Sequence, residues 1–439
     1  MPLRLCVVLV LGAAACVPSR SELRDPVDAD IAKRLGTSEH VDIDALLAKP
    51  LDREGAVKIA LANSPRLAAA FDDLGIAGGE LAAALGLGPT EIDAKIRFGH
   101  GAHEYEFDAI QNVLGLVTAP RRRAAARADL AATRAMATAT TLELAARVEI
   151  AFHDLVAAQQ DVELRRTAFD AADAAATVRE RMYAAGNTTD LAQARDRDAR
   201  EQARIELARA EAAALARREV LNVLLGLSGD RTSWTATGTL AEAPAAAPAL
   251  DDLEAAAVGA SLDLAAGRAR TEGAANRLGA ERVRAVLPEL GVGASVIDRD
   301  GTIEVGPALR LGIPLFDQRA GDRARAQAEA ARADHELVAT AIELRAHARA
   351  VRVAALATYA EARHIHEVVL PLRQQIVDET LLHYNAMDAD PFQLIIARRE
   401  LADAGHQYLD ALRRFADAMT EVAALRRGVL LRRSDVDHP

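Results

Sequence analysis

The sequence contains the same order of segments twice, and this internal repeat constrains its fold more than any other feature. The tripeptide Leu-Ala-Ala opens an apolar helical stretch at Leu67 and again at Leu264. Tyr183 and Tyr384 each begin a short break in a long helical pattern, at equivalent places of the two halves. Self-similarity of this kind is the signature of a duplicated structural unit. We therefore predict two copies of a helix, a pair of short strands and two much longer helices.

The composition favours long, partly solvated helices over a compact mixed core. The chain has 439 residues, of which 51% are hydrophobic, 27% are charged and only 3% are aromatic. Alanine, leucine, arginine and glutamate dominate, and all four favour helix. A formal net charge of −11 with scattered arginines and few aromatics argues against a nucleic-acid partner. The charge alone does not exclude the alternative of an ordinary acidic soluble protein.

The N-terminus resembles a bacterial lipoprotein signal. Arg4 precedes an apolar run over residues 5–11, and three alanines lead directly into Cys16. This resemblance implies that residues 1–15 are removed and that Cys16 is acylated, so that lipid anchors the mature chain. Val17, in place of an aspartate after the cysteine, favours the outer membrane. A plain cleaved signal is the alternative, and in either case Cys6 is lost and no intrachain disulfide can form.

Two pairs of segments alternate between apolar and polar residues, which is the pattern of strands with one apolar face. The first pair predicts strands at 91–99 and 103–114, and the second predicts strands at 290–297 and 302–313. These segments are eight to twelve residues long, close to the span of a tilted membrane strand, which is about nine to eleven residues. Pro307, inside the fourth segment, should lie where the sheet needs no N–H donor.

Four strands are too few to close a barrel alone. A sheet in lipid must have no free edge, because each unpaired backbone group costs several kcal/mol there, and small closed barrels need about eight strands. We therefore expect several chains to share one barrel in the lipid of a membrane. The alternative is two soluble hairpins that cap a helical bundle.

The predicted helices are too long for a globular domain. The helical pattern begins at Pro120 and continues to residue 186 without another proline or a plausible glycine stop. It predicts a helix of roughly 65 residues, which is about 100 Å long. A corresponding helix is predicted over 318–386, and shorter partners over 190–226 and 391–427. Apolar residues recur every seven positions, which is coiled-coil spacing, at Val148, Leu155 and Val162 and at Leu337, Leu344 and Val351. Two antiparallel pairs of this length would reach across a periplasm.

Five short motifs occur in a fixed order across the two halves. They are Asn63-Ser64-Pro65-Arg66-Leu67, Ala119-Pro120-Arg121-Arg122-Arg123, Arg181-Met182-Tyr183-Ala184-Ala185-Gly186-Asn187, Asn222-Val223-Leu224-Leu225-Gly226 and Ile313-Pro314-Leu315-Phe316-Asp317. In this order they resemble the TolC family of outer-membrane efflux factors, within it the branch that serves heavy-metal and related RND-type pumps. The resemblance covers nearly all of residues 51–428. It departs at Met387, where the family usually has glycine.

The resemblance implies a mainly α protein with membrane β-structure. Three chains would form a twelve-stranded barrel in the outer membrane of a Gram-negative bacterium, above an α-barrel of long antiparallel coiled-coil helices in the periplasm. It implies no catalytic chemistry and no cofactor. Energy would come from an inner-membrane RND-type pump, and a periplasmic adaptor protein would join the pump to the duct. Drugs, metal ions and other small molecules are all compatible with such a duct.

The two helical turns are the expected sites of adaptor docking and gating. The candidate residues at these turns are Tyr183, Gly186, Asp190, Tyr384, Asp388 and Asp390. In a trimer each carboxylate would appear three times around a narrowing, where such rings attract cations and repel anions. Alternatively, Asp190 and Asp390 cap the helices that follow them, and the two roles can coexist.

No catalytic or metal-binding pattern stands out in the sequence. His364 and His366 are two apart on a predicted helix, so they cannot share a metal as an i, i+4 pair could. His100 and His103 lie at a predicted turn, where solvated polar residues are common. The serines and the remaining cysteine have no basic partner at a recognisable spacing. We therefore expect that this protein is not an enzyme.

The sequence divides into six segments on this interpretation. A periplasmic adaptor would have one helical hairpin instead of two, and a structural coiled-coil lipoprotein would not explain the strands, so these two alternatives fit less well. The segments are a signal at 1–15, an extension at 16–50, a first repeat at 51–228, a linker at 229–250, a second repeat at 251–428 and a tail at 429–439.

Overall fold

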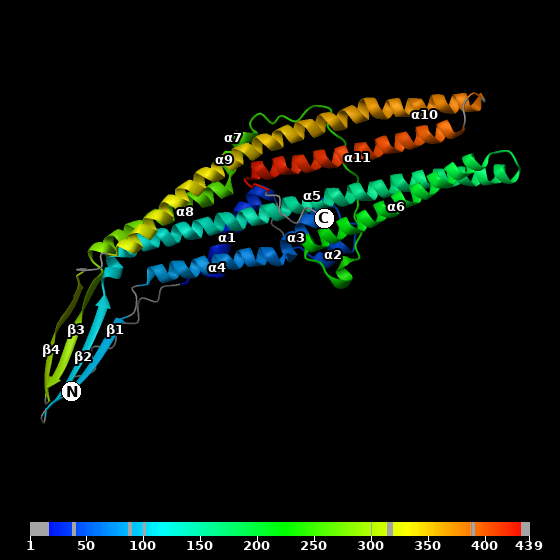
Figure 1. Cartoon of the computed structure of the whole chain (residues 1–439). Coiled ribbons are helices and arrows are strands. Elements are labelled where there is room, and N and C mark those ends of the chain that lie inside the picture. The colour runs from blue at the N-terminus through cyan, green and yellow to red at the C-terminus, as the bar shows by residue number, and fades with distance from the viewer. Residues whose placement is uncertain are drawn as a thin grey trace. The chain divides into compact units, whose positions relative to one another are not determined.

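A computed structural model shows a largely helical chain, and its described residues form a four-stranded sheet (Figure 1). No helix within the described ranges combines the length and the apolar character needed to cross a membrane. Cys16, Asp390 and the 1–15 segment lie outside the described residues. The structure describes residues 17–36, 41–86, 90–99, 102–299, 301–313, 319–386, 388 and 391–431.

The chain forms two compact units, and each unit draws on both sequence repeats. We describe each unit by itself. Unit 1 comprises Met1–Arg34, Ala68–Ala139 and Leu262–Glu343, and unit 2 comprises Leu35–Leu67, Thr140–Ser261 and Leu344–Pro439.

Unit 1 contains all four strands, which pair antiparallel in chain order. Strands β1 (Thr90–Gly99) and β2 (Ala102–Asn112) form one hairpin, and β3 (Glu289–Arg299) and β4 (Thr302–Gly312) form the other. β2 pairs with β3, so the order is β1-β2-β3-β4. Successive strands simply lie side by side, and no crossover is needed.

The strand ends differ from the predicted ones by one to two residues. β2 ends at Asn112 rather than at residue 114, because the Asn112 side chain accepts a hydrogen bond from the N–H of Leu114 at 3.0 Å and so starts the next helix. β3 extends to Arg299, two residues beyond the prediction. Pro307 lies opposite Ala294 in regular register. It is on β4, which is an edge strand of this sheet, so one side of its backbone faces no strand of the described chain.

The helices of unit 1 pack through small residues. Helix α1 (Arg20–Leu35) buries Leu23, Val27 and Ile31. Gly78 on α4 (Pro65–Leu85) allows this packing, because a Cβ there would lie 2.7 Å from a methyl group of Leu23. In the second repeat, α8 (Leu262–Val286) leads into β3.

The first long helix, α5, begins earlier than predicted. It spans Leu114–Ala184, so Pro120 lies inside it rather than at its start. A proline removes only one N–H from the helix near its beginning. The N–H of Leu114 bonds to the Asn112 side chain, so α5 starts at an upstream residue rather than at the proline.

The second long helix is interrupted, contrary to the prediction of one continuous helix over 318–386. Helix α9 (Ala320–His364) passes into a π-helical turn at Ile365–Val369, and α10 (Leu370–Asn385) follows. The N–H of Leu370 bonds to the carbonyl of Ile365, five residues back. Pro371 stands at the start of α10, where its missing N–H favours a wider turn over a regular one.

Unit 2 has an apolar core built from helices and from the linker between the repeats. Helices α2 (Ile43–Leu47), α3 (Arg53–Asn63), α6 (Asp190–Leu225), α7 (Leu253–Ala260) and α11 (Pro391–Arg427) belong to it. The predicted linker is not a solvated tether. A short 3-10 turn (Gly229–Thr232) opens it, Leu51 bridges to Ala236, and Trp234 and Leu240 are buried in the core.

Two of the sequence motifs meet at the end of α6. The Asn63 amide donates hydrogen bonds to the carbonyls of Leu225 at 2.9 Å and Gly226 at 2.8 Å. Gly226 caps the helix with a φ of +67°, and a Cβ there would lie 2.7 Å from the Asn63 carbonyl oxygen. Trp234 donates its indole N–H to Asn222 at 2.8 Å, beside this cap. The spacing of these motifs therefore reflects a helix-end contact rather than a binding site.

The Gly226→Ala variant should lose about 1–3 kcal/mol of stability, because alanine meets both a left-handed backbone and the Asn63 carbonyl. Thermal unfolding of the detergent-solubilised protein measures the loss. Gly229→Ala is the matched control, since Gly229 has a φ of +61° and open space around it. An equal loss in both variants would show that the close approach of Asn63 contributes nothing.

Candidate functional site

The sheet has two faces of opposite character. One face is apolar and largely exposed, and Ile92 and Phe98 are exposed by 74% and 76%. The register places apolar residues of all four strands together on this face, at Ile92, Ala94, Ile96, Phe98, Tyr105, Phe107, Ala109, Val292, Ala294, Val296, Val305, Pro307, Leu309 and Leu311. A surface of this kind marks contact with lipid or with another protein.

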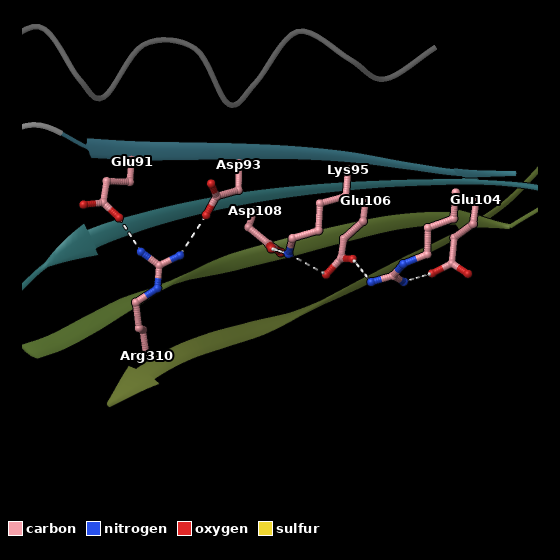
Figure 2. Close-up of polar contacts among 8 residues, drawn as sticks. Glu91, Asp93, Lys95, Glu104, Glu106, Asp108 and Arg310 are labelled. Carbon is pink, nitrogen blue, oxygen red and sulfur yellow. Dashed lines mark hydrogen bonds and ion pairs between the residues drawn. The ribbon is translucent and has the colours of Figure 1, made fainter. Parts of the chain in front are cut away.

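The opposite face carries a ladder of ion pairs. Lys95 lies 3.0 Å from the carboxylate of Asp108 and 3.5 Å from that of Glu106 (Figure 2). Arg97 lies 2.9 Å from Glu104 and 3.1 Å from Glu106. These residues alternate along β1 and β2 with the apolar set, as the period of two predicts. The charges therefore satisfy one another along the face away from the apolar surface.

One ion pair on this face joins strands that are not neighbours. Arg310 on β4 binds Glu91 and Asp93 on β1, and the Asp93 contact is 2.7 Å (Figure 2). β2 and β3 lie between these strands in the sheet. The sheet must therefore curve so that its charged face is concave, because an arginine could not otherwise reach across two strands.

The first helical turn joins α5 to α6 and is held within the chain. Gly186 has a φ of +74°, and the N–H of Asn187 bonds to the carbonyl of Met182 at 2.8 Å. The prediction that Asp190 caps α6 is wrong. Thr189 is the cap, and its hydroxyl accepts a hydrogen bond from the N–H of Ala192 at 3.2 Å.

Asp190 instead bonds to Tyr183 across the turn. This hydrogen bond and the negative charge of Asp190 raise the pKa of the Tyr183 hydroxyl above its usual range. Both residues are exposed, and Asp190 lies in the first turn of α6, where a carboxylate interacts favourably with the helix dipole. The N–H of Gly186 also bonds to the carbonyl of Tyr183 at 2.9 Å, so the structure brings together three of the six predicted turn residues.

A buried ion pair fastens the two helices next to this turn. Arg179 on α5 donates to the carboxylate of Asp196 on α6 at 2.6 Å, and to the Thr188 hydroxyl at 3.2 Å. The side chains of Arg179 and Asp196 are only 12% and 4% exposed. Sequence reasoning missed this pair, because neither residue belongs to the turn and the two are separated by 17 positions.

The second helical turn, between α10 and α11, is held by a different pair. His383 Nδ1 lies 3.0 Å from Asp388, and both side chains are well exposed. Tyr384 is 40% exposed. An open groove of about 510 Å³ lies beside this pair. Residues that line it are Leu372, Gln375, Ile376, Glu379, Thr380, His383, Asp388 and Gln393.

The described residues hold no group of three or more histidine, cysteine, aspartate or glutamate side chains arranged for a metal ion. His366 stacks on Tyr408, with ring centroids 5.3 Å apart, so this histidine has a packing role. His100 lies outside the described part of the chain.

A charged cluster inside unit 2 was not anticipated. Asp417 on α11 lies 3.5 Å from His153 on α5 and 3.1 Å from Arg413, and Arg413 also binds Asp154 at 3.0 Å. Burial raises the pKa of Asp417, and the nearby Asp154 adds to this effect against the pull of His153 and Arg413. The only sequence signal is the spacing of Asp410, Arg413 and Asp417 on one helix face.

The Asp417→Asn variant should therefore be at least as stable as the wild type at neutral pH. A raised pKa means that the folded state disfavours the ionised carboxylate, so the wild type loses stability as pH rises from the usual aspartate range through the raised pKa. The advantage of asparagine should be greatest above that window and should vanish below it. Melting temperatures across a pH series measure this.

Asp410→Asn is the matched control on the same helix. Burial opposes ionisation of Asp410, but Arg413 and Arg414 outweigh it and lower its pKa. Asp410 therefore contributes stability at neutral pH that is lost as pH falls through the lowered pKa, and its replacement should destabilise. The same sign for both variants would contradict this interpretation.

Solved structures with this architecture include outer-membrane proteins and channels. The outer membrane protein VceC of Vibrio cholerae superposes with a TM-score of 0.71 at 16% identity, over 87% of this chain and 97% of VceC. The CmeC outer membrane channel of Campylobacter jejuni superposes with a TM-score of 0.65 at 12% identity, over 95% of this chain and 90% of CmeC. This chain has the fold of the outer-membrane channels, and the predicted fold class is confirmed.

A comparison of sequences finds a relative that is described as a heavy-metal resistance protein. The cobalt-zinc-cadmium resistance protein CzcC of Cupriavidus metallidurans is 26% identical over 307 residues, which cover 69% of this chain and 71% of CzcC. No protein-family model matches the sequence. The resemblance to the TolC family and its heavy-metal branch is thus confirmed through these neighbours.

Proposed function

We propose that this protein is the outer-membrane exit duct of a tripartite efflux pump in a Gram-negative bacterium. The observation that carries the proposal is the sheet with one exposed apolar face and one concave charged face. Such a sheet can present its apolar side to lipid and its charged side to water. The fold shared with VceC and CmeC supports the same function.

The duct would be a homotrimer. β1 to β4 have 10 or 11 residues each, which suits tilted strands in the outer membrane. Within the described residues, β1 and β4 each pair with one strand only. Because free edges are not tolerated in lipid, the four strands need other copies to close a barrel.

The helical turns are the proposed contacts with the periplasmic adaptor, which would connect the duct to an inner-membrane RND-type pump. Tyr183, Gly186 and Asp190 form one turn, and Tyr384 and Asp388 lie at the other. Asp388 and Asp390, repeated three times in a trimer, would favour cations at the narrow end. Lipid on Cys16 would add an anchor, which labelling with radioactive palmitate would detect.

Metal cations are the cargo class that we favour. The relative CzcC is described as a cobalt-zinc-cadmium resistance protein. On the charged face of the sheet the carboxylates outnumber the basic groups, which favours cations in a pore. The carboxylates are Glu91, Asp93, Glu104, Glu106, Asp108, Glu289 and Glu304, and the basic residues are Lys95, Arg97, Arg299 and Arg310.

Membrane fractionation and light scattering of the detergent extract test the proposal. We expect a trimer in the outer-membrane fraction, and increased sensitivity to cobalt, zinc or cadmium when the gene is deleted. A trimer with unchanged metal sensitivity would contradict the proposed metal cargo but not the trimeric duct. A soluble monomer would overturn the duct and favour a periplasmic coiled-coil or adaptor lipoprotein.

A further inference from the structure

The two edge strands carry opposite charge patterns on the concave face. On β1, the end next to α4 is acidic with Glu91 and Asp93, and the distal half is basic with Lys95 and Arg97. On β4 the order is reversed. Arg310 lies at the end next to the helices, and Glu304 lies in the distal half.

The register shows that these charges lie at matching heights in the sheet. Lys95 pairs with Glu106, Glu106 with Ile297, and Ile297 with Glu304, so Lys95 and Glu304 share one rung. Glu91 connects in the same way to Ala308, which is two residues from Arg310. Lys95 and Arg97 therefore lie within two residues of the rung of Glu304, whereas Glu91 and Asp93 lie two and four residues from the rung of Arg310.

We propose that these two edges bind each other between copies of the chain. Arg310 on β4 of one copy would bind Glu91 and Asp93 on β1 of the next, and Glu304 would bind Lys95 and Arg97 of that next copy. This proposal rests on the homotrimeric duct proposed above. It adds the side chains that select the partner edge and fix its register.

Geometry favours the contact between copies over the contact within one chain. Within the chain, Arg310 reaches its carboxylates across two intervening strands, and neighbouring strands are about 4.8 Å apart. Next to β4 in a closed ring, β1 of the following copy would be only one strand spacing away. Joining two different edges is a head-to-tail contact, which closes into a ring when the rotation permits.

The charge pattern would also reject wrong registers. Sliding the next copy's β1 by four residues would set Arg310 against Lys95 and Arg97, and like charges that meet at an interface are strongly disfavoured. A backbone edge alone has little such selectivity, because its hydrogen-bonding groups repeat along the strand. The side chains thus supply the register that the backbone lacks.

Cysteine cross-linking between differently tagged chains tests the proposal. One chain carries Glu91→Cys and the other carries Arg310→Cys, so a disulfide can form only between copies. After coexpression and oxidation we expect a covalent dimer with both tags on a non-reducing gel. In the control pair, Glu91→Cys with Glu304→Cys, the second cysteine lies six residues along β4 from Arg310, and this pair should give at least tenfold less dimer. Equal yields from the two pairs, or no dimer from the first pair, would overturn the proposal.

Charge reversal gives a second readout. Arg310→Glu should reduce the detergent-stable trimer by roughly tenfold or more, since it sets three carboxylates together. Adding Glu91→Arg and Asp93→Arg to the same chain should restore the trimer. If the triple variant formed as little trimer as Arg310→Glu alone, the proposed ion pairs between β4 and the next copy's β1 would be contradicted. If the wild type itself is not a trimer, the duct proposal fails. If the wild type is a trimer but the cysteine pair gives no cross-link, only the proposed ion pairs between the edge strands are contradicted.

Discussion

Replacing Val296 with arginine should remove the protein from the outer membrane. Val296 lies on the apolar face in the middle of β3, paired with Phe107 and Val305. If this face meets lipid, an arginine near the bilayer midplane costs about 2–4 kcal/mol, and a trimer incurs that cost three times. Blots of outer-membrane fractions should show loss of the detergent-stable trimer and degradation of the chain.

The neighbouring substitution Ile297→Arg is the matched control. Ile297 is also partly buried, but it lies on the charged face between Glu106 and Glu304. An arginine there gains carboxylate partners, so we expect trimer at nearly the wild-type level. If both variants assembled equally well, the apolar face would not be the lipid-facing surface. If Ile297→Arg alone failed, the assignment of the two faces would be reversed.

Replacing Asp196 with asparagine should loosen the first helical turn. This change leaves the Arg179 guanidinium buried without its carboxylate, and breaking a buried ion pair in this way costs about 3–5 kcal/mol. The amides at the ends of α5 and α6 should then exchange with deuterium roughly a hundredfold faster or more, because each 1.4 kcal/mol is a factor of about ten. Limited proteolysis should cut near Gly186.

Asp198→Asn is the control for this prediction, because Asp198 is an exposed carboxylate two residues further along α6 and lies on a different face of the helix. Its replacement should leave exchange at the turn unchanged. Equal exchange in the wild type and in Asp196→Asn would show that the Arg179–Asp196 pair does not hold the turn.

The sequence predicted those parts of the fold that depend on periodicity. The alternation of Ile92 and Phe98 with Glu91 and Arg97 predicted a sheet with two unlike faces, and the structure confirms it. The pattern could not predict that Arg310 would reach β1, because that contact depends on the curvature of the sheet. Curvature arises from the summed twist of four strands and leaves no local signature.

Helix ends were harder to predict because several residues compete to form them. Pro120 is a common start signal, yet Asn112 starts α5. Asp190 is a good capping residue, yet Thr189 precedes it and caps α6. In the second repeat we gave no weight to Pro371, and the structure places a π-turn directly before α10. Which of several nearby residues begins a helix depends on packing, and the local sequence does not show that packing.

Each compact unit contains segments from both halves of the sequence, so the repeat and the folding unit are different things. A gene for one repeat would encode half of each unit, and only a second such chain could complete them. The proposed trimer would then correspond to a ring of six ancestral half-chains. The buried Trp234 and Leu240 make the junction part of the core. A chain cut within 229–250 should therefore yield two halves that fold only when they bind each other.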